Sequence, residues 1–547
     1  MDVLNDTVAH ARSFVSMSPH QLAITIPLGL CILLILALLP SRNGAKQPPM
    51  LPETIPYVTN TLQYLTNMDT FLARAKKALA KGNIVGFRLG GIPFYFLTSP
   101  ANIQTFFRTS PAIGFERFIL IAITNMMGAS PSDVAKFADD KSGRMPNPAP
   151  GTPDGATRYW YAMQTMMHKY LSTTHYSNSL ATTYQRFFGR ELDTLFPKGQ
   201  WTETRIVPLM KDAMAKAAIV SFQGEYIFEL TPNLLDLLWE ADKVLSTILY
   251  GPPKWLYRGV YDKMERLCQA MARYYAAAME KFDWDNETER EKDWEPVFGS
   301  RFWREFAWWM VDEGKFTNRS CGGFVAATGL IASNANTVPV CTWAILEMIR
   351  DPGLLERLRE EVDSVVVVEN GERKFDIQRL VNLPLLQSVY VEVMRLRVSI
   401  HVTREVVQPL EVEGYTLKPG SVLQAPTELA HWNEEVWGVE GHPAAEFWAE
   451  RHVKYADGKA VFEMRGRPTD FFPYGGGVAV CPGRHFAKQE IMLTTAMLAS
   501  KFDYDFVGWV NMDGSPSDRP PVNDPKYTGG AGVPPDRDMK VRVKRRW

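Results

Sequence analysis

The segment that most constrains the fold of this chain is a loop rich in glycine around a single cysteine. Residues 471–490 read FFPYGGGVAVCPGRHFAKQE, and the three glycines at 475–477 permit tight turns and close approach of a flat ligand to the backbone. Cys481 follows them, and a helical pattern begins near Arg484. A thiolate just before a helix amino terminus is stabilised by free N–H groups and by the positive end of the helix dipole. The pattern therefore predicts a loop that presents a thiolate to a flat ligand.

Two simpler interpretations of this loop remain open from the residues alone. A free cysteine is most often a small buried hydrophobic residue. A phosphate-binding loop would need G-K-[ST] or G-x-G-x-x-G, and neither is present here. The chain has 5 cysteines, an odd number, and none of them forms a C-x-x-C pair. This pattern argues against a disulfide framework or a structural zinc site and favours a reducing compartment.

An apolar run near the amino terminus predicts a membrane anchor. Residues 22–39, LAITIPLGLCILLILALL, contain no charge and are just long enough to span a bilayer core. A cleaved signal peptide would have basic residues before the run, whereas Asp2 and Asp6 lie there and Arg42 and Lys46 follow it. A buried core helix is the other alternative. The charges favour an uncleaved anchor with the bulk of the chain in the cytosol.

The rest of the chain is expected to form one domain, mainly α with a smaller β portion. The expected organisation is a short lumenal tail (1–21), the anchor (22–39), a proline-rich linker (40–56) and a catalytic domain (57–547). A hairpin is predicted at 84–97, further strands at 408–424, and a long apolar helix at 322–350. The net charge of -1 gives no field that would attract nucleic acid.

The cysteine loop resembles the haem-binding loop of cytochromes P450, F-x-x-G-x-x-x-C-x-G followed by an aromatic residue and Ala. The matching positions are Tyr474, Gly475, Gly477, Cys481, Gly483, Phe486 and Ala487. Tyr474 stands where the family usually has Phe. Ala479 stands where many members carry an Arg that pairs with a haem propionate. The resemblance implies the cytochrome P450 fold and haem b, with the iron ligated axially by Cys481.

Earlier motifs extend the resemblance. Glu392 and Arg395 share one helix face, which alone is typical of many surface ion pairs. At this distance from the cysteine loop, they resemble the family's K-helix pair. FWAERH (447–452) resembles its F-x-P-E-R-F segment, which implies that Arg451 completes a structural triad with them. Arg404 matches the position that commonly reaches a haem propionate.

The long apolar helix lacks the acid and alcohol that the family usually carries beside the oxygen site. Ala335 replaces the acid and Asn336 the threonine, with Thr337 as the next candidate, a pattern similar to the sterol 7α-hydroxylase and prostacyclin synthase branch. Pro339 cannot donate to the carbonyl of Ala335, so the helix is expected to open there. Asn336 could then position a water for catalysis. Alternatively, Asn334 and Asn336 only form hydrogen bonds within the helix.

The resemblance implies a monooxygenase that inserts one oxygen atom of O2 into a lipophilic small molecule. Its implied partners are NADPH–cytochrome P450 reductase, with cytochrome b5 as a further candidate, and its implied location is the endoplasmic reticulum membrane, single-pass. The apolar segments around 101–130 and 205–225 are expected to be loops that line the pocket, which suits a terpenoid, steroid or polyketide. The alternative is a haem-thiolate isomerase or dehydratase that needs neither O2 nor a reductase, and a haem-based gas or electron carrier is a third.

Overall fold

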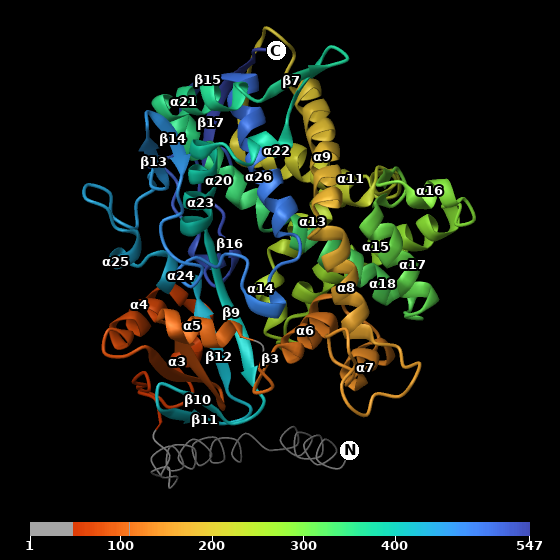
Figure 1. The fold of residues 1–547 in the computed structure, drawn as a ribbon, viewed down its shortest axis with the longest axis vertical. Coiled ribbons are helices and arrows are strands. Elements are labelled where there is room, and N and C mark those ends of the chain that lie inside the picture. The colour runs from red at the N-terminus through yellow and green to blue at the C-terminus, as the bar shows by residue number, and fades with distance from the viewer. Residues whose placement is uncertain (1–46, 109) are drawn as a thin grey trace, which may run out of the picture.

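The computed structural model describes residues 47–108 and 110–547, and most of them form helices (Figure 1). The predicted tail and anchor, and the linker up to residue 46, lie outside the described residues. The described end of the linker is packed against the domain, because the Leu51 N–H donates to the Gly86 carbonyl at 2.7 Å. Leu51 is also buried. The packed part of the chain therefore begins before residue 57.

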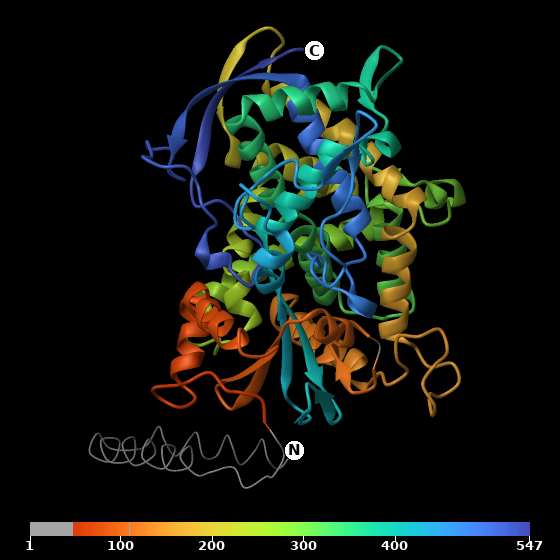
Figure 2. The same cartoon turned by 60° about the vertical axis from the view of Figure 1, so that its left-hand side comes forward.

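The largest sheet lies at one end of the molecule beside the first helices (Figures 1 and 2). Its strand order is β1-β2-β12-β9-β16, and β3 also pairs with β9, at its carboxyl end. Its strands are β1 (Ile84–Leu89), β2 (Ile92–Leu97), β3 (Ile113–Gly114), β9 (Val398–Val406), β12 (Val422–Pro426) and β16 (Gly530–Gly532). Leu89 pairs with Ile92, so the predicted hairpin is confirmed.

Small sheets complete the β portion. Their strands are β10 (Leu410–Val412) with β11 (Tyr415–Leu417), β15 (Phe502–Val510) with β17 (Asp538–Arg545) and β4 (Trp201–Arg205), β13 (Val453–Ala456) with β14 (Lys459–Phe462), β5 (Trp294–Glu295) with β6 (Gly299–Ser300), and β7 (Val366–Glu369) with β8 (Glu372–Phe375). The turn between β10 and β11 consists of Glu413 and Gly414, both with positive φ (52° and 73°), the conformation that two-residue hairpins favour.

The helices of the first half are α3 (Thr59–Thr66), α4 (Met68–Leu79), α5 (Pro100–Phe107), α6 (Glu116–Ile121), η1 (Ala122–Met126), α7 (Pro131–Asp139), α8 (Tyr159–Leu171), α9 (Thr174–Leu195), α10 (Ile206–Leu209), η2 (Met210–Met214), α11 (Ala215–Gln223), α12 (Tyr226–Leu230), α13 (Leu234–Asp242) and α14 (Leu245–Leu249). The helices of the second half are α15 (Arg258–Lys281), α16 (Glu287–Glu291), α17 (Arg301–Asp312), α18 (Asn318–Phe324), η3 (Val325–Ile331), α19 (Ala332–Asn334), α20 (Thr337–Arg350), α21 (Pro352–Asp363), α22 (Ile377–Leu380), α23 (Pro384–Arg397), α24 (Thr427–His431), α25 (Glu434–Trp437), η4 (Gly477–Ala479), α26 (Arg484–Lys501) and η5 (Pro525–Tyr527).

Three of the α-helices begin with the same local signal, a polar cap followed by proline. Ser99, Ser130 and Asp351 each accept a hydrogen bond from a backbone N–H of the first turn. A proline follows each cap, where its missing N–H has no helical partner to lose.

The apolar helix predicted at 322–350 is part of a longer run from α18 to α20, which is interrupted after Asn334. Among the described residues, the stretch Asn318–Arg350 is the one helical run with the length and apolar composition to cross a membrane. However, 67% of its most apolar window is buried inside the protein, as expected of a core helix. It packs against α23, which contains Glu392 and Arg395, and against α26, which begins shortly after Cys481.

The prediction that 205–225 forms a loop is wrong. After Arg205, this segment forms α10, η2 and α11, and α11 packs against α9 with nearly all of its side chains buried. The segment is rich in Ala and Met, which have high helix propensity, so burial in a core helix satisfies the apolar pattern as well as a pocket wall would. The segment 101–130 is also mostly structured, as α5, β3, α6 and η1.

Candidate functional site

The cysteine loop is closed by its own backbone. The Cys481 N–H donates to the Tyr474 carbonyl at 3.0 Å, and the Val480 N–H donates to the Gly477 carbonyl at 3.1 Å. Gly475 and Gly477 have φ of 71° and 65°, which disfavours any side chain there. A Cβ on Gly477 would also collide with the Phe107 carbonyl. The loop thus needs these glycines to bring its backbone against α5.

Cys481 differs from the other cysteines that the structure describes. Cys268, Cys321 and Cys341 are buried, and burial raises the pKa of each thiol. Cys481 is half-buried, and α26 begins three residues later. Burial raises the pKa of its thiol too, but the backbone N–H groups of Gly483 and Arg484 oppose that shift. These donors favour a thiolate, as expected of an axial ligand.

The predicted triad is present and completely buried. Arg395 binds Glu392 in a bidentate manner, at 2.7 and 3.0 Å, and Arg451 Nε donates to the same carboxylate at 2.9 Å. All three side chains have 0% exposure. Burial alone would raise the pKa of Glu392, but hydrogen bonds from His452 and Arg395 and the charges of both arginines hold it well below the usual value.

His452, which stands where the F-x-P-E-R-F segment has its last Phe, is a fourth member of this network, a role that its sequence position alone does not indicate. Its Nδ1 accepts the Arg465 N–H at 3.1 Å, so the ring proton is assigned to Nε2. Nε2 lies 3.4 Å from Glu392 Oε1. Burial lowers the pKa of His452, so the ring is neutral and its Nε2 lies beside the carboxylate.

The network is connected to the cysteine loop through His431, which the sequence analysis also missed. Arg395 donates to the His431 carbonyl at 2.8 Å, and His431 Nε2 accepts the Phe472 N–H at 3.1 Å. Burial and the charge of Arg395 lower the pKa of His431 to about 3, which keeps the ring neutral and Nε2 able to accept. A second contact joins Tyr390 Oη on α23 to Tyr474 Oη at 3.0 Å. Helix α23 therefore holds the start of the loop at two points.

Arg404 is a buried cation beside the same loop. Its guanidinium donates to the carbonyls of Gly476 (3.2 Å) and Thr403 (2.9 Å), and 7% of the residue is exposed. Within the described part of the chain, no carboxylate lies within ion-pair distance of it, and burial lowers its pKa to about 10. A buried guanidinium without an anionic partner, next to a glycine loop and a cysteine, fits the propionate of a haem.

The predicted opening of the distal helix is observed. Helix α19 ends at Asn334 and α20 begins at Thr337, and Pro339 has no N–H to give the Ala335 carbonyl. Ala332 is exposed and Ala335 and Asn336 are half-buried, whereas the residues of η3 and α20 on either side are almost all buried. The break therefore presents accessible backbone in the middle of an apolar core helix.

Both functions of the Asn336 amide already have protein partners. Its Nδ2 donates to the Ala332 carbonyl at 3.3 Å, and its Oδ1 accepts the Gly532 N–H at 3.1 Å. Asn336 thus ties the break to β16, which pairs with β9. An amide has a second N–H and a second lone pair, so one donor and one acceptor remain for a water. Thr337 is buried, and its hydroxyl donates to the Ser333 carbonyl at 2.7 Å.

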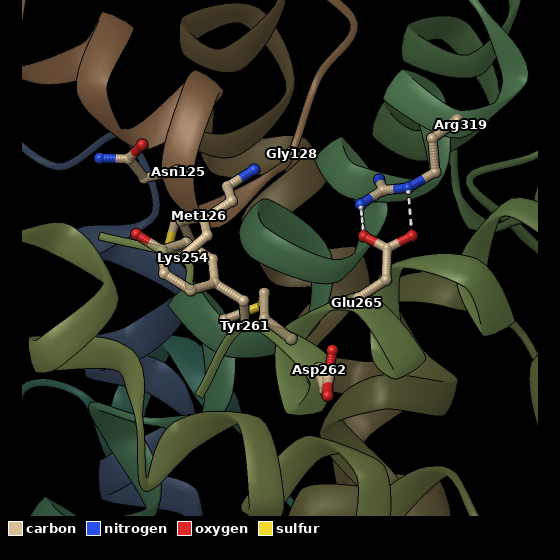
Figure 3. Close-up of a pocket in the computed structure, with 9 residues that line it drawn as sticks. Asn125, Met126, Gly128, Lys254, Tyr261, Asp262, Glu265 and Arg319 are labelled. Carbon is tan, nitrogen blue, oxygen red and sulfur yellow. Dashed lines mark hydrogen bonds and ion pairs between the residues drawn. The ribbon is translucent and has the colours of Figure 1, made fainter. Parts of the chain in front are cut away.

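A separate cavity of about 190 Å³ lies between η1, α15 and α18 (Figure 3). Its wall includes Arg319, which binds Glu265 at 2.6 and 3.1 Å and the Met127 carbonyl at 2.9 Å. None of its lining residues belongs to the cysteine loop or β9. This cavity is therefore not the site around Cys481, although Arg319 fixes the end of η1 against α15 and α18.

Comparisons with known proteins agree with this geometry. The family described as Cytochrome P450 matches residues 208–514. The chain is 42% identical over 539 residues to the cytochrome P450 monooxygenase calL of Penicillium decumbens, with 96% of this chain and 98% of that protein covered. It is 26% identical to the cytochrome P450 monooxygenase efuG of Hormonema carpetanum, with 92% and 91% covered.

Among solved structures, the retinoic acid-bound cyanobacterial CYP120A1 has a TM-score of 0.63 at 15% identity and covers 92% of this chain and 100% of its own. This likeness confirms the predicted fold class. The family implies haem held through a cysteine thiolate. The chain therefore belongs to the cytochrome P450 family, as an oxidoreductase of the monooxygenase type.

Proposed function

We propose that this P450 inserts one oxygen atom of O2 into a lipophilic small molecule, such as a terpenoid, steroid or polyketide, with electrons from NADPH–cytochrome P450 reductase. The observation that carries the proposal is the accessible break at 332–336 in an otherwise buried apolar helix. An apolar wall of this kind suits a substrate without charges. Relatives that align along nearly the whole chain are named as monooxygenases.

Each residue around the cysteine has a distinct proposed role in holding the cofactor. Cys481 ligates the iron, Arg404 binds a propionate in place of the missing Arg at Ala479, and Gly475 and Gly477 allow close approach of the flat ring. When bound, haem supplies an iron centre that activates O2 as electrons arrive. The buried triad keeps Cys481 in position, and the apolar helices exclude water from the site.

The isomerase or dehydratase alternative is favoured by one specific observation. The accessible stretch 332–336 consists of Ala, Ser, Asn, Ala and Asn, so it contains no titratable side chain. Oxygenation needs protons, whereas rearrangement of an oxygenated substrate does not need O2 or a reductase. Oxygenation remains the preferred proposal, because a water held at Asn336 can pass on protons and the relatives that align along nearly the whole chain are named as monooxygenases.

Isotope labelling separates these two functions. Purified holoprotein with reductase and NADPH, supplied with a panel of terpenoids, steroids and polyketides under oxygen-18 gas, is expected to form a product that carries one labelled oxygen atom. NADPH should be consumed only when reductase is present. A product formed without NADPH and without label would contradict oxygenation and support the isomerase. Mass spectrometry of extracted products provides the measurement.

The ligand assignment is tested by Cys481→Ser, with Cys341→Ser as the matched control. Serine does not provide a thiolate, so the reduced carbon monoxide complex of the first variant should lose the red-shifted Soret band of thiolate-ligated haem. Cys341 is buried in α20 and should leave that band unchanged. An unchanged band in Cys481→Ser would show that another residue holds the iron.

The role of Asn336 is tested by Asn336→Leu, with Asn334→Leu as the control on the same helix. Leucine keeps bulk but cannot hold a water or accept the Gly532 N–H. Product formation should fall about 10- to 100-fold, at about 1.4 kcal/mol per tenfold, while haem loading survives and hydrogen peroxide rises. Asn334 lies within the same stretch, but its side chain is fully buried and donates to the Leu330 carbonyl, so its variant should keep tight coupling. Full activity and coupling in Asn336→Leu would remove Asn336 from the mechanism.

A further inference from the structure

Arg144 has a buried donor that none of the proposed roles uses. It lies in the loop between α7 and α8, and its side chain is 11% exposed. Its Nη2 is buried and has no hydrogen-bond partner in the described structure. Among the described residues, the other terminal guanidinium nitrogen of this kind is Arg304 Nη1, which lies 3.5 Å from the Glu295 carboxylate. The unpaired Nη2 of Arg144 therefore marks a place where an anionic acceptor would stabilise the protein.

Two aromatic rings hold the Arg144 guanidinium in place. Its Cζ lies 4.4 Å from the centroid of the Phe115 ring and 4.3 Å from that of the Trp160 ring. Its loop is fixed as well, because the Asp140 carboxylate accepts the N–H groups of Ser142 at 2.9 Å and of Trp160 at 3.1 Å. A guanidinium that is stacked in this way loses little further freedom when it binds a ligand.

The ion pair with Glu116 occupies only one edge of this guanidinium. Arg144 Nε donates to Glu116 Oε1 at 3.0 Å, and Glu116 Oε2 accepts the Phe115 N–H at 3.0 Å. The Glu116 side chain is 42% exposed, whereas Arg144 Nη2 is buried. The paired edge therefore lies toward the surface and Nη2 toward the interior. A guanidinium has five N–H donors, so the second edge can bind a second anion.

Arg144 lies close to the cation that contacts the cysteine loop. Arg404 Cζ lies 5.3 Å from the centroid of the same Phe115 ring. The strand before that ring reaches β9 as well, because Gly114 pairs with Glu405. Helix α6 also packs against β9, which carries Arg404. The two guanidinium groups thus contact one aromatic ring at the edge of the haem site.

Haem b carries two propionate carboxylates, and Arg404 accounts for one of them. Ala479 contributes no charge, so the second propionate still needs a partner. An arginine suits this role, because its planar fork matches a carboxylate. Arg117 is nearer to Arg404 in the fold but is not equivalent to Arg144, because it is 44% exposed and is already paired with Glu405 at 2.9 Å.

We propose that Arg144 binds the second haem propionate and so supplies, from the loop before α8, a second buried cation for the cofactor. Phe115 and Trp160 position its guanidinium, and Glu116 orients it from the surface side. The proposal rests on the haem site proposed around Cys481. It does not rest on oxygenation, because haem is bound without turnover.

Resonance Raman spectra of the purified ferric holoprotein test this contact directly. The bending modes of the two propionates respond to their hydrogen bonds, so Arg144→Gln should shift one of these bands and leave the other in place. Arg117→Gln is the matched control, a neighbouring cation that is paired elsewhere, and it should leave both bands unchanged. Unchanged propionate bands in Arg144→Gln would overturn the proposal and assign the buried donor to another anion, such as a substrate carboxylate.

The rate of haem release gives a second measure. Loss of a charge-assisted hydrogen bond should speed the transfer of haem from Arg144→Gln to an excess of apomyoglobin about 10- to 100-fold. Arg144→Lys keeps the charge without the planar fork, so it should release haem at an intermediate rate, and it serves as the second variant if Arg144→Gln does not fold. Wild-type release rates in both variants would contradict the proposal. Both reduced carbon monoxide complexes should keep the red-shifted Soret band, which distinguishes this effect from a failure of the Cys481 assignment.

The reduction potential of the haem separates this contact from a purely structural ion pair. Arg144→Gln removes a positive charge near haem and should lower the potential. Glu116→Gln removes a negative charge but keeps an acceptor for Arg144 Nε, so it should raise the potential. If Arg144 only fastened its loop to α6, both variants would weaken the same contact and act in the same direction. Shifts of the same sign, or no shift in either variant, would overturn the proposal.

Discussion

The arrangement of the site depends on the buried ion pairs that the carboxylate of Glu392 forms. This carboxylate is fully buried and is contacted by Arg395 on its own helix and by Arg451 and His452, so two segments distant in sequence meet on one charge. A buried ion pair often adds little net stability, yet removal of one member leaves uncompensated charge and costs about 3–5 kcal/mol. The network therefore specifies one arrangement of α23 and the segment before the cysteine loop.

The same network also fixes the position of the cysteine loop. Arg395 fixes the His431 carbonyl, the His431 ring fixes the Phe472 N–H, and the loop backbone closes between Tyr474 and Cys481. Because the pKa of Glu392 is lowered in the folded protein, its contribution is present above the ordinary pKa of 4.5 and is lost as pH falls below it. Acid should therefore release the cysteine loop as the network protonates.

Local chemistry explains what could be predicted from the sequence. Gly90 and Gly91 mark the β1–β2 turn, Pro339 predicts the helix break, and the spacing of Glu392 and Arg395 places both on one helix face. Each of these features depends only on residues that are neighbours in the sequence. The apolar pattern at 205–225 was misread, because an alanine- and methionine-rich core helix and a pocket wall have the same composition.

Contacts between distant segments could not be predicted in this way. His431 and His452 act through partners on α23 and in the cysteine loop, which no spacing in the sequence reveals. Arg404 was identified by resemblance, but only the structure shows that it has no carboxylate partner among the described residues.

The central claim, that the Glu392 network holds the haem-binding cysteine in place, is tested most directly by the haem content of Glu392→Ala. Glu265→Ala is the matched control, because it also removes a carboxylate from an arginine but at a partly exposed site. The account predicts soluble, haem-loaded Glu265→Ala and very little haem-loaded Glu392→Ala, as measured by haem absorbance per purified polypeptide. Normal haem content and full solubility in Glu392→Ala would contradict it.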